Sequence, residues 1–398
     1  MVVVAMASGA PMAQEHRAVP QATYRFATFN VSMYRDQPGA LVQELAGPGT
    51  DQVRNVAEII QRTAPDVLLL NEFDYDAGGE ALRLFREHFL EVSQHGAPPI
   101  HYEYAYAAPS NTGVPSGLDL NGDGKTNTAD DALGFGQFPG QYAFAILSRF
   151  PLRVDQLRSF QSFLWKDMPQ SLLPQDFYDE QKRAVLRLSS KNHVDLPVAL
   201  PDGRLIHVLA SHPTPPTFDG PEDRNGRRNA DEIRLWADYI TPGQGGYLRD
   251  DQGRNGGLAQ EASFVVLGDM NADPNDGDAW PGAIKRLLDS PRIHQAVATG
   301  NLVPRATGGA NFARRNPSHH GDPANDTAAF AGGLRVDYVL PSGNLDPLAS
   351  GIFWPDEQDP LAHLVAWPEG SEPASSDHHL VWVDIQANSC RRLLAWCP

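Results

Sequence analysis

Short β-rich runs, each bounded by turn-forming residues, recur along most of the 398 residues and constrain the fold more than any other feature. The runs lie at 24–31, 66–71, 142–148, 184–189, 204–211, 263–268, 335–340 and 379–385. Apolar residues at helical spacing predict helices at 51–63, 79–92 and 229–240. Because strands outnumber helices and the two do not alternate strictly, the pattern predicts sheets covered by helices, in an α/β or α+β arrangement.

The composition is typical of a folded protein with a substantial core, since 41% of the residues are apolar. No apolar run approaches the about 18 residues that a membrane span needs. Lys plus Arg number 32 against 49 Asp plus Glu, so the formal net charge is −17. This charge disfavours a broad nucleic-acid-binding surface, which would need clustered basic residues. We find no internal repeat and no low-complexity linker, which favours one elaborated domain.

The two termini indicate export. Residues 1–13 resemble the end of a secretory signal peptide, although they lack a basic segment, and a frayed apolar terminus is the alternative. In the tail at 388–398, Cys390 and Cys397 are close enough in sequence for one disulfide in an oxidising compartment. We therefore expect a secreted or periplasmic protein.

An acidic loop within 109–140 has the spacing of a twelve-position calcium loop, with oxygen-bearing side chains at alternating positions and glycine at the sixth. Because the twelfth position is Asp and not Glu, and no clear helices flank the loop, we expect modest affinity in an isolated calcium loop; a solvated turn is the alternative. The expected Ca²⁺ ligand positions are Asp119, Asn121, Asp123, Lys125, Asn127 and Asp130.

Polar residues also follow several of the apolar runs, where a purely structural role would not require them. Each has a structural alternative when it is taken alone, such as a satisfied buried amide or a capping carboxylate. Asp337, inside an apolar run, needs a cationic or imidazole partner if it is buried. The set consists of Asn30, Glu72, His212, Asp269 with Asn271, Asp337, and Asp377 with His378.

Read together, these motifs, and above all GDMN, RVDYVL and SDHH in this order, resemble the endonuclease/exonuclease/phosphatase family. The resemblance covers residues 24–385 and is greatest to the secreted bacterial members, which carry a similar DLNGDG loop. It implies a four-layer α/β sandwich, DNase I-like, in which two facing mixed sheets are flanked by helices. The domain would span 24–387.

The family resemblance also implies metal-dependent hydrolysis of phosphoesters. Glu72 would be the principal Mg²⁺ or Mn²⁺ ligand, helped by Asn30 and Asp377. Oxygen-rich ligands of this kind suit those ions. The catalytic residues would be His212, Asp269, Asn271, Asp337 and His378, with Asp269 activating water and His378, held by Asp337, contacting the phosphate.

The substrate is less constrained than the chemistry. Arg183 and Lys191 are candidate substrate-binding residues if the runs at 184–189 and 204–211 are neighbours; a solvated basic face is the alternative. We favour a monomeric exported phosphodiesterase or phosphatase acting on small or lipid-derived phosphoesters. A secreted nuclease, a non-catalytic calcium-dependent binding protein and a zinc hydrolase that uses His319 and His320 with the histidines at 378 and 379 are the alternatives.

Overall fold

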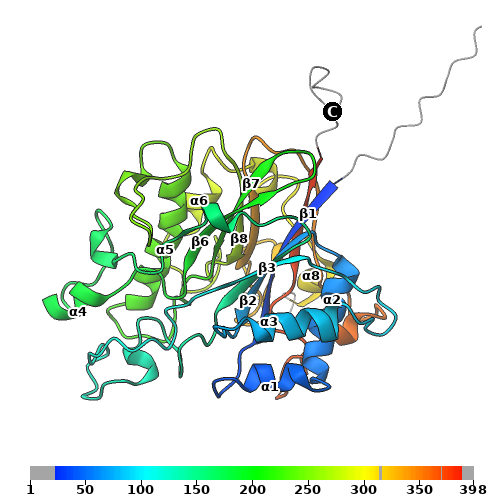
Figure 1. The fold of residues 1–398 in the computed structure, drawn as a ribbon, viewed down its shortest axis with the longest axis horizontal. Coiled ribbons are helices and arrows are strands. Elements are labelled where there is room, and N and C mark those ends of the chain that lie inside the picture. The colour runs from blue at the N-terminus through cyan, green and yellow to red at the C-terminus, as the bar shows by residue number, and fades with distance from the viewer. Residues whose placement is uncertain (1–22, 313–315, 369, 388–398) are drawn as a thin grey trace, which may run out of the picture.

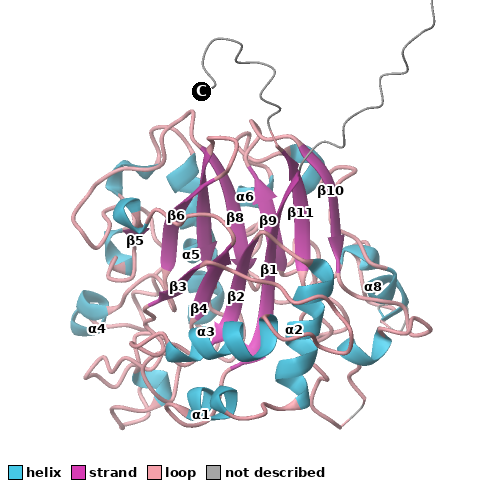
Figure 2. Ribbon diagram, turned by 45° about the vertical axis from the view of Figure 1, so that its right-hand side comes forward, coloured by secondary structure: helices cyan, strands magenta, loops and turns pink. Residues whose placement is uncertain are grey.

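The apolar runs of the sequence form the central strands of two β-sheets that pack face to face (Figures 1 and 2). The computed structural model describes residues 23–312, 316–368 and 370–387. Helices cover the outer faces of both sheets, so the chain forms the α/β sandwich that the sequence predicts. The expected signal peptide and the two cysteines lie outside the described residues.

The first sheet has six strands in the order β10-β11-β1-β2-β4-β3. Strand β1 is parallel to β2 and antiparallel to β11, so the sheet is mixed. The strands are β1 (Thr23–Met33), β2 (Val67–Phe73), β3 (Tyr104–Ala108), β4 (Phe144–Ser148), β10 (Pro347–Ile352) and β11 (Val381–Gln386).

The second sheet has five strands in the order β5-β6-β7-β8-β9, and only β7 and β8 run parallel. The strands are β5 (Arg158–Ser159), β6 (His193–Ala199), β7 (Leu205–Ser211), β8 (Ser263–Asp269) and β9 (Asp337–Pro341).

The prediction of a strand at 184–189 is wrong. Residues Glu180–Val185 form helix α4, and β6, which begins at His193, is the strand that pairs with β7. The helix forms because the Asp179 side chain caps it, accepting a hydrogen bond from the Lys182 N–H at 2.9 Å. The apolar residues Leu186 and Leu188 are buried without joining a strand.

The inner faces of the two sheets bury one apolar layer. Phe26, Leu69 and Ile146 from the first sheet pack in the same cluster as Val208 and Val265 from the second. All are fully buried. Because each such side chain contributes about 1.5–3 kcal/mol when it is removed from water, this layer fixes the sheets against one another.

Helices α1 (Ala40–Ala46), α2 (Asp51–Thr63) and α3 (Glu80–Phe85) cover the outer face of the first sheet, and α5 (Arg224–Ile240) and α6 (Lys285–Leu288) cover that of the second (Figure 1). Helix α2 begins after Thr50, whose side chain caps the Val53 N–H, and it matches the predicted range 51–63. The remaining helices of this kind are α7 (Gln295–Ala298) and α8 (Thr307–Phe312).

Short helical turns complete the secondary structure. A π-turn at Arg86–Leu90 continues α3, so the helix predicted at 79–92 is present in two parts. The 3₁₀ turns are Ala129–Asp131, Val154–Gln156, Trp165–Asp167, Gly245–Tyr247, Pro323–Asn325 and Ala362–Val365. No helix among the described residues has the length and apolar character to cross a membrane.

Strand register gathers polar residues at one end of the sandwich. Asn30 on β1 lies beside Asn71 on β2, and Asp269 on β8 lies beside Asp337 on β9. The two sheets are joined here, because the Asn71 side-chain carbonyl accepts a hydrogen bond from the Asp269 N–H at 3.3 Å. The ends of four strands thus meet at one place.

Candidate active site

A cavity of about 380 Å³ opens at this end of the sandwich. Its walls include Glu72 from β2, Asp269 and Asn271 from the end of β8, and Asp377 and His378 from the segment before β11. The structure therefore brings five of the residues that the sequence singled out to a single cavity.

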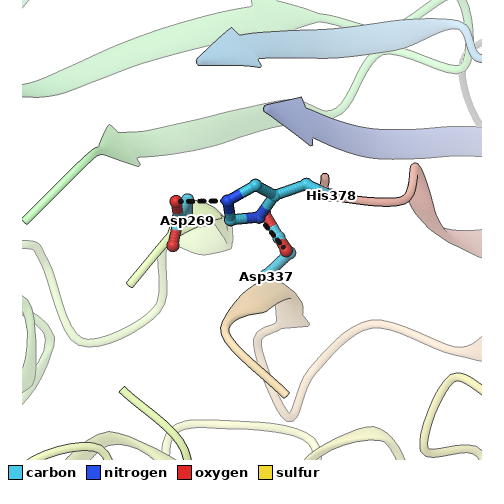
Figure 3. A group of neighbouring side chains, drawn as sticks. All are labelled: Asp269, Asp337 and His378. Atoms are coloured by element: carbon cyan, nitrogen blue, oxygen red, sulfur yellow. Dashed lines mark hydrogen bonds and ion pairs between the residues drawn. The ribbon is translucent and has the colours of Figure 1, made fainter. Parts of the chain in front are cut away.

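His378 lies between two buried carboxylates, with one ring nitrogen toward each (Figure 3). Its Nδ1 is 2.9 Å from Asp337 Oδ2, and its Nε2 is 3.6 Å from Asp269 Oδ2. Burial acts against the charged imidazole, but Asp337 and Asp269 outweigh it and raise the pKa of His378 well above its ordinary value. The expected pairing of Asp337 with an imidazole is present, and His378 is held as a charged donor.

Asp269 is buried yet receives several donors. The Asn271 N–H donates to its Oδ1 at 2.8 Å, and the Asn30 amide donates to its Oδ2 at 3.1 Å. Burial raises the pKa of Asp269 to about 7, with Asp337 adding to the effect and His378 opposing it. A carboxylate with a pKa near neutrality is suited to accept a proton from water at physiological pH.

His212 lies behind Asp269 and does not line the cavity. It is 2% exposed, its Nε2 is 3.4 Å from Asp269 Oδ2, and its Nδ1 has no hydrogen-bond partner. Burial, with Lys191 and His378 nearby, holds the pKa of His212 well below its ordinary value, so the ring is neutral. In the structure, His212 contacts the carboxylate of Asp269.

Glu72 and Asp377 provide a second, more open group of oxygens. Burial raises the pKa of Glu72, the nearby His378 acts to lower it, and the negative charge of Asp377 acts to raise it. Glu72 and Asp377 are therefore two carboxylates that repel each other in one cavity. Among the residues that the structure describes, no lysine or arginine lines this cavity. Two carboxylates without a paired basic side chain, supported by the Asn30 amide, fit a hard divalent cation.

Among the described residues, one group of His, Cys, Asp or Glu offers at least three ligand atoms within 4.8 Å of one another, namely Asp269, Asp337 and His378. These residues could bind a metal. In the structure, however, His378 already donates from Nδ1 to Asp337, and its Nε2 faces Asp269 at 3.6 Å.

Lys191 and Arg183, which the sequence treats as a pair, are in different environments. Lys191 precedes β6 and is 7% exposed; burial lowers its pKa, while Glu232, Glu72 and Asp269 act to raise it. Arg183 lies on α4 and donates to the Gln175 carbonyl on the surface. Only Lys191 is close enough to the cavity to act on its carboxylates electrostatically.

Four buried supporting residues escape recognition in the sequence. Asn71 joins the sheets, Thr327 donates to Asp337 Oδ2 at 2.8 Å, and Ser376 donates to the Asn30 carbonyl at 2.7 Å. Glu232 on α5 accepts the N–H groups of Ser190 at 2.6 Å and Thr214 at 2.7 Å, next to Lys191 and His212. Asn71, directly before Glu72, had a detectable signal as a polar residue at a strand end.

The predicted calcium loop is folded around its own carboxylates. The Asp119 carboxylate, at the first position of the loop, accepts hydrogen bonds from the N–H groups of Gly122, Asp123 and Gly124 and so holds the turn that follows it. Asp130 is exposed, and it is Asp131 that turns inward, accepting the Leu120 N–H at 2.8 Å. The three expected carboxylates, at 119, 123 and 130, do not form a group with ligand atoms within 4.8 Å.

The histidines of the zinc alternative do not converge. His319 pairs with Asp326 at 3.0 Å, His320 pairs with Asp276 at 3.1 Å, and His379 stacks on Trp354 with ring centroids 3.7 Å apart. Among the residues that the structure describes, they form no common ligand group. The geometry gives no support to a zinc site built from them.

Comparison with known proteins identifies the family. The family model described as "Endonuclease/Exonuclease/phosphatase family" matches residues 27–378. The chain belongs to this family. The chemistry of the family is phosphoester hydrolysis, and its enzymes generally use divalent metals. A comparison of the sequence with curated proteins found no significant match.

One solved structure of an endonuclease/exonuclease/phosphatase protein shares the fold, and two other solved structures are more distantly similar. A family protein from Beutenbergia cavernae DSM 12333 matches with a TM-score of 0.52 at 15% identity, over 92% of this chain and 72% of that one. A family protein from Leptotrichia buccalis C-1013-b gives 0.47 at 13% identity, over 91% and 99%. Sphingomyelinase C from Streptomyces griseocarneus gives 0.47 at 14% identity, over 92% and 100%. The first match confirms the predicted DNase I-like sandwich.

Proposed function

We propose that this family member is an exported, metal-dependent phosphodiesterase or phosphatase that hydrolyses small or lipid-derived phosphoesters by in-line attack of water. The observation that carries the proposal is the chain of contacts from Asp337 through His378 to Asp269, opening on a cavity that also holds Glu72 and Asp377. It provides a base, a charged donor and a set of oxygen ligands in one place. Phosphoryl transfer needs these three parts and no covalent intermediate.

Each of the residues at the site has its own role in the proposed reaction. Asp269 orients a water and accepts its proton as the water oxygen bonds to phosphorus and the bond to the leaving oxygen breaks. Asn271, at a left-handed φ of 49°, has its N–H tied to Asp269 and its side chain tied to the Pro213 carbonyl at 3.1 Å. His378 donates to a phosphoryl oxygen, and Asp337 fixes the orientation of its ring and its charge.

Asn30, Glu72 and Asp377 would hold the Mg²⁺ or Mn²⁺ ion, because the His378 ring of the alternative group already donates to Asp337 and faces Asp269. When bound, the ion neutralises charge on the phosphoryl oxygens and on the leaving oxygen. The Asn30 amide links the two parts of the site, since it donates to Asp269 and also supports Glu72.

Substrate and location are proposed from charge and from the termini. A secreted nuclease is the alternative within the same chemistry, and the net charge of −17 favours a smaller substrate than a polyanion. Export rests on the sequence of residues 1–13 and on the two cysteines of the tail. We further propose that Ca²⁺ stabilises the loop that begins at Asp119, whose carboxylate accepts the N–H groups of Gly122 and Gly124.

Hydrolysis of bis(p-nitrophenyl) phosphate tests the proposed function. We expect activity with added Mg²⁺ or Mn²⁺, loss in chelator, and recovery when the metal is restored. Asp269→Ala should reduce kcat by at least about 100-fold, because general-base catalysis contributes on this scale. A variant that turns over like the wild type would refute the mechanism, and inactivity of the folded wild type toward all phosphoesters would favour a non-catalytic calcium-dependent binding protein.

A further inference from the structure

A second cavity, of about 350 Å³, lies on the other side of the wall that carries His378. The wall consists of two paired chain segments, in which the Ala329 N–H donates to the Asp377 carbonyl at 2.8 Å. Phe330 and His378 line the catalytic cavity, whereas Ala329 and His379 line the second one. Successive side chains of an extended segment point to opposite faces, so neighbouring residues serve different cavities. The two cavities are therefore separate and share one wall.

Aromatic rings form much of the wall of the second cavity. Trp354 stacks on His379 with ring centroids 3.7 Å apart, and Phe312 lies against Trp354 with centroids 5.5 Å apart. Trp367 also lines the cavity and is 42% exposed. Among the described residues that line it, none is lysine or arginine, and the acidic Glu357 is exposed to water. Such a wall favours an uncharged aromatic ligand, because rings pack against rings and an unpaired charge is costly to bury.

His379 gives this cavity a polar group that the protein does not satisfy. Its side chain is buried, since the residue is 2% exposed, and among the described residues neither of its ring nitrogens has a hydrogen-bond partner. Trp354 covers a face of the ring, whereas the nitrogens lie on its edge. Buried polar groups are nearly always hydrogen-bonded, and leaving one unpaired costs free energy. A ligand in the cavity that bonds to His379 would remove this cost.

The volume of the cavity limits the size of such a ligand. An apolar cavity of about 150 Å³ holds one benzene molecule. At about 350 Å³, this cavity has room for one or two rings with a polar substituent. A hydroxyl group both donates and accepts hydrogen bonds, so it can pair with either ring nitrogen of His379.

We propose that the second cavity is a binding site for a small uncharged aromatic molecule that carries a hydroxyl group, with His379 as its hydrogen-bonding partner. The rings of Trp354, Phe312 and Trp367 pack against the aromatic part of the ligand. The site is separate from the catalytic cavity, so the inference does not depend on the proposed function.

Two probes that differ by one hydroxyl group, p-cresol and toluene, test the inference by isothermal titration calorimetry with the full chain. We expect one p-cresol molecule to bind per chain. Toluene should bind about 3- to 10-fold more weakly, because a single hydrogen bond has a net effect of this size on affinity. In NMR spectra of the ¹⁵N-labelled histidine rings, p-cresol should shift the ring signals of His379, which are identified by their absence in His379→Phe.

Three variants locate the binding. His379→Phe keeps a ring against Trp354 but removes both nitrogens, so the affinity for p-cresol should fall to that for toluene. Its thermal unfolding midpoint should stay the same or rise, because no buried nitrogen is left without a partner. Ala362→Leu enlarges a side chain that lines the cavity and should weaken the binding of both probes by about 10-fold or more. Ala77→Leu is the matched control, because Ala77 is exposed and lines neither cavity, and it should bind both probes as the wild type does.

Several results would overturn the inference. These are no saturable binding of p-cresol, equal affinities of the wild type for p-cresol and toluene, and full affinity for p-cresol in Ala362→Leu, which would place the probe elsewhere. A large fall in the unfolding midpoint of His379→Phe would show that the ring nitrogens serve the fold and would also overturn it. None of these measurements requires turnover, so an inactive protein would refute the proposed function and leave the second site in place.

Discussion

Replacing Asp337 by Asn perturbs the site at the point where its charge is set. The Asp337 carboxylate is 1% exposed, its Oδ2 accepts from His378 Nδ1 at 2.9 Å and from Thr327 at 2.8 Å, and its Oδ1 has no partner. The substitution removes the negative charge that outweighs burial in raising the pKa of His378, and it can reverse the tautomer of the ring. His378 would then face the phosphate neutral or without its proton.

The expected magnitude follows from these contacts. A hydrogen bond between charged groups contributes about 1.5–3 kcal/mol, which alone corresponds to about a 10- to 150-fold effect on rate. Loss of tautomer control behind a catalytic imidazole lowers kcat by up to about 10⁴-fold. We therefore expect kcat for bis(p-nitrophenyl) phosphate to fall by about 10²- to 10⁴-fold. The free energy of unfolding should change little, because the neutral amide of Asn also removes a negative charge next to the Asp269 carboxylate.

A double-mutant cycle checks that Asp337 acts through His378. The rate is measured for Asp337→Asn, His378→Ala and the double variant, with the thermal unfolding midpoint as a control for folding. If the reasoning is right, Asp337→Asn costs almost nothing once His378 is absent. A full additional loss in the His378→Ala background, or wild-type activity of Asp337→Asn, would refute it.

Three further predictions concern pH, Lys191 and calcium. Asp269 accepts a proton only when it is ionised, and burial raises its pKa to about 7. We therefore expect kcat/KM to fall as the pH decreases to this value and below it, and a bound cation to move this fall to lower pH. A kcat/KM that stays constant from about pH 5 to 9 would contradict the role of Asp269. Lys191→Met keeps the buried volume but removes a cation close to Glu72 and Asp269. We expect kcat/KM to fall by about 10-fold or more while the thermal unfolding midpoint stays the same. An unchanged kcat/KM would exclude a role of Lys191 in phosphate binding. Asp119→Ala should lower the unfolding midpoint only in the presence of Ca²⁺, and an equal loss in chelator would mean that the loop needs no ion.

The local sequence predicted the central strands because each of these strands lies between two layers of the structure. Both faces of such a strand are therefore buried, and its residues form a continuous apolar run. The runs at 24–31, 66–71, 204–211 and 263–268 coincide with β1, β2, β7 and β8. Strand β6 was missed since it contains His193, Asp195 and Pro197, which look unsuited to a buried strand. His207 and Tyr239 satisfy Asp195, and Ser189 satisfies His193, through contacts that only the folded chain provides.

The residue types and their order along the chain predicted the family, the sandwich and, through the family, the hydrolysis of phosphoesters. A carboxylate at a strand end, an Asp with an Asn two residues later and a final Asp-His pair carry enough information to predict them. Tertiary structure alone decided how these groups act on one another. It placed the imidazole of His378 between Asp337 and Asp269, it turned His212 inward, and it left Arg183 on the surface. Charge and proton affinity in a buried site depend on neighbours distant in sequence and on exclusion of water, which a linear pattern does not record.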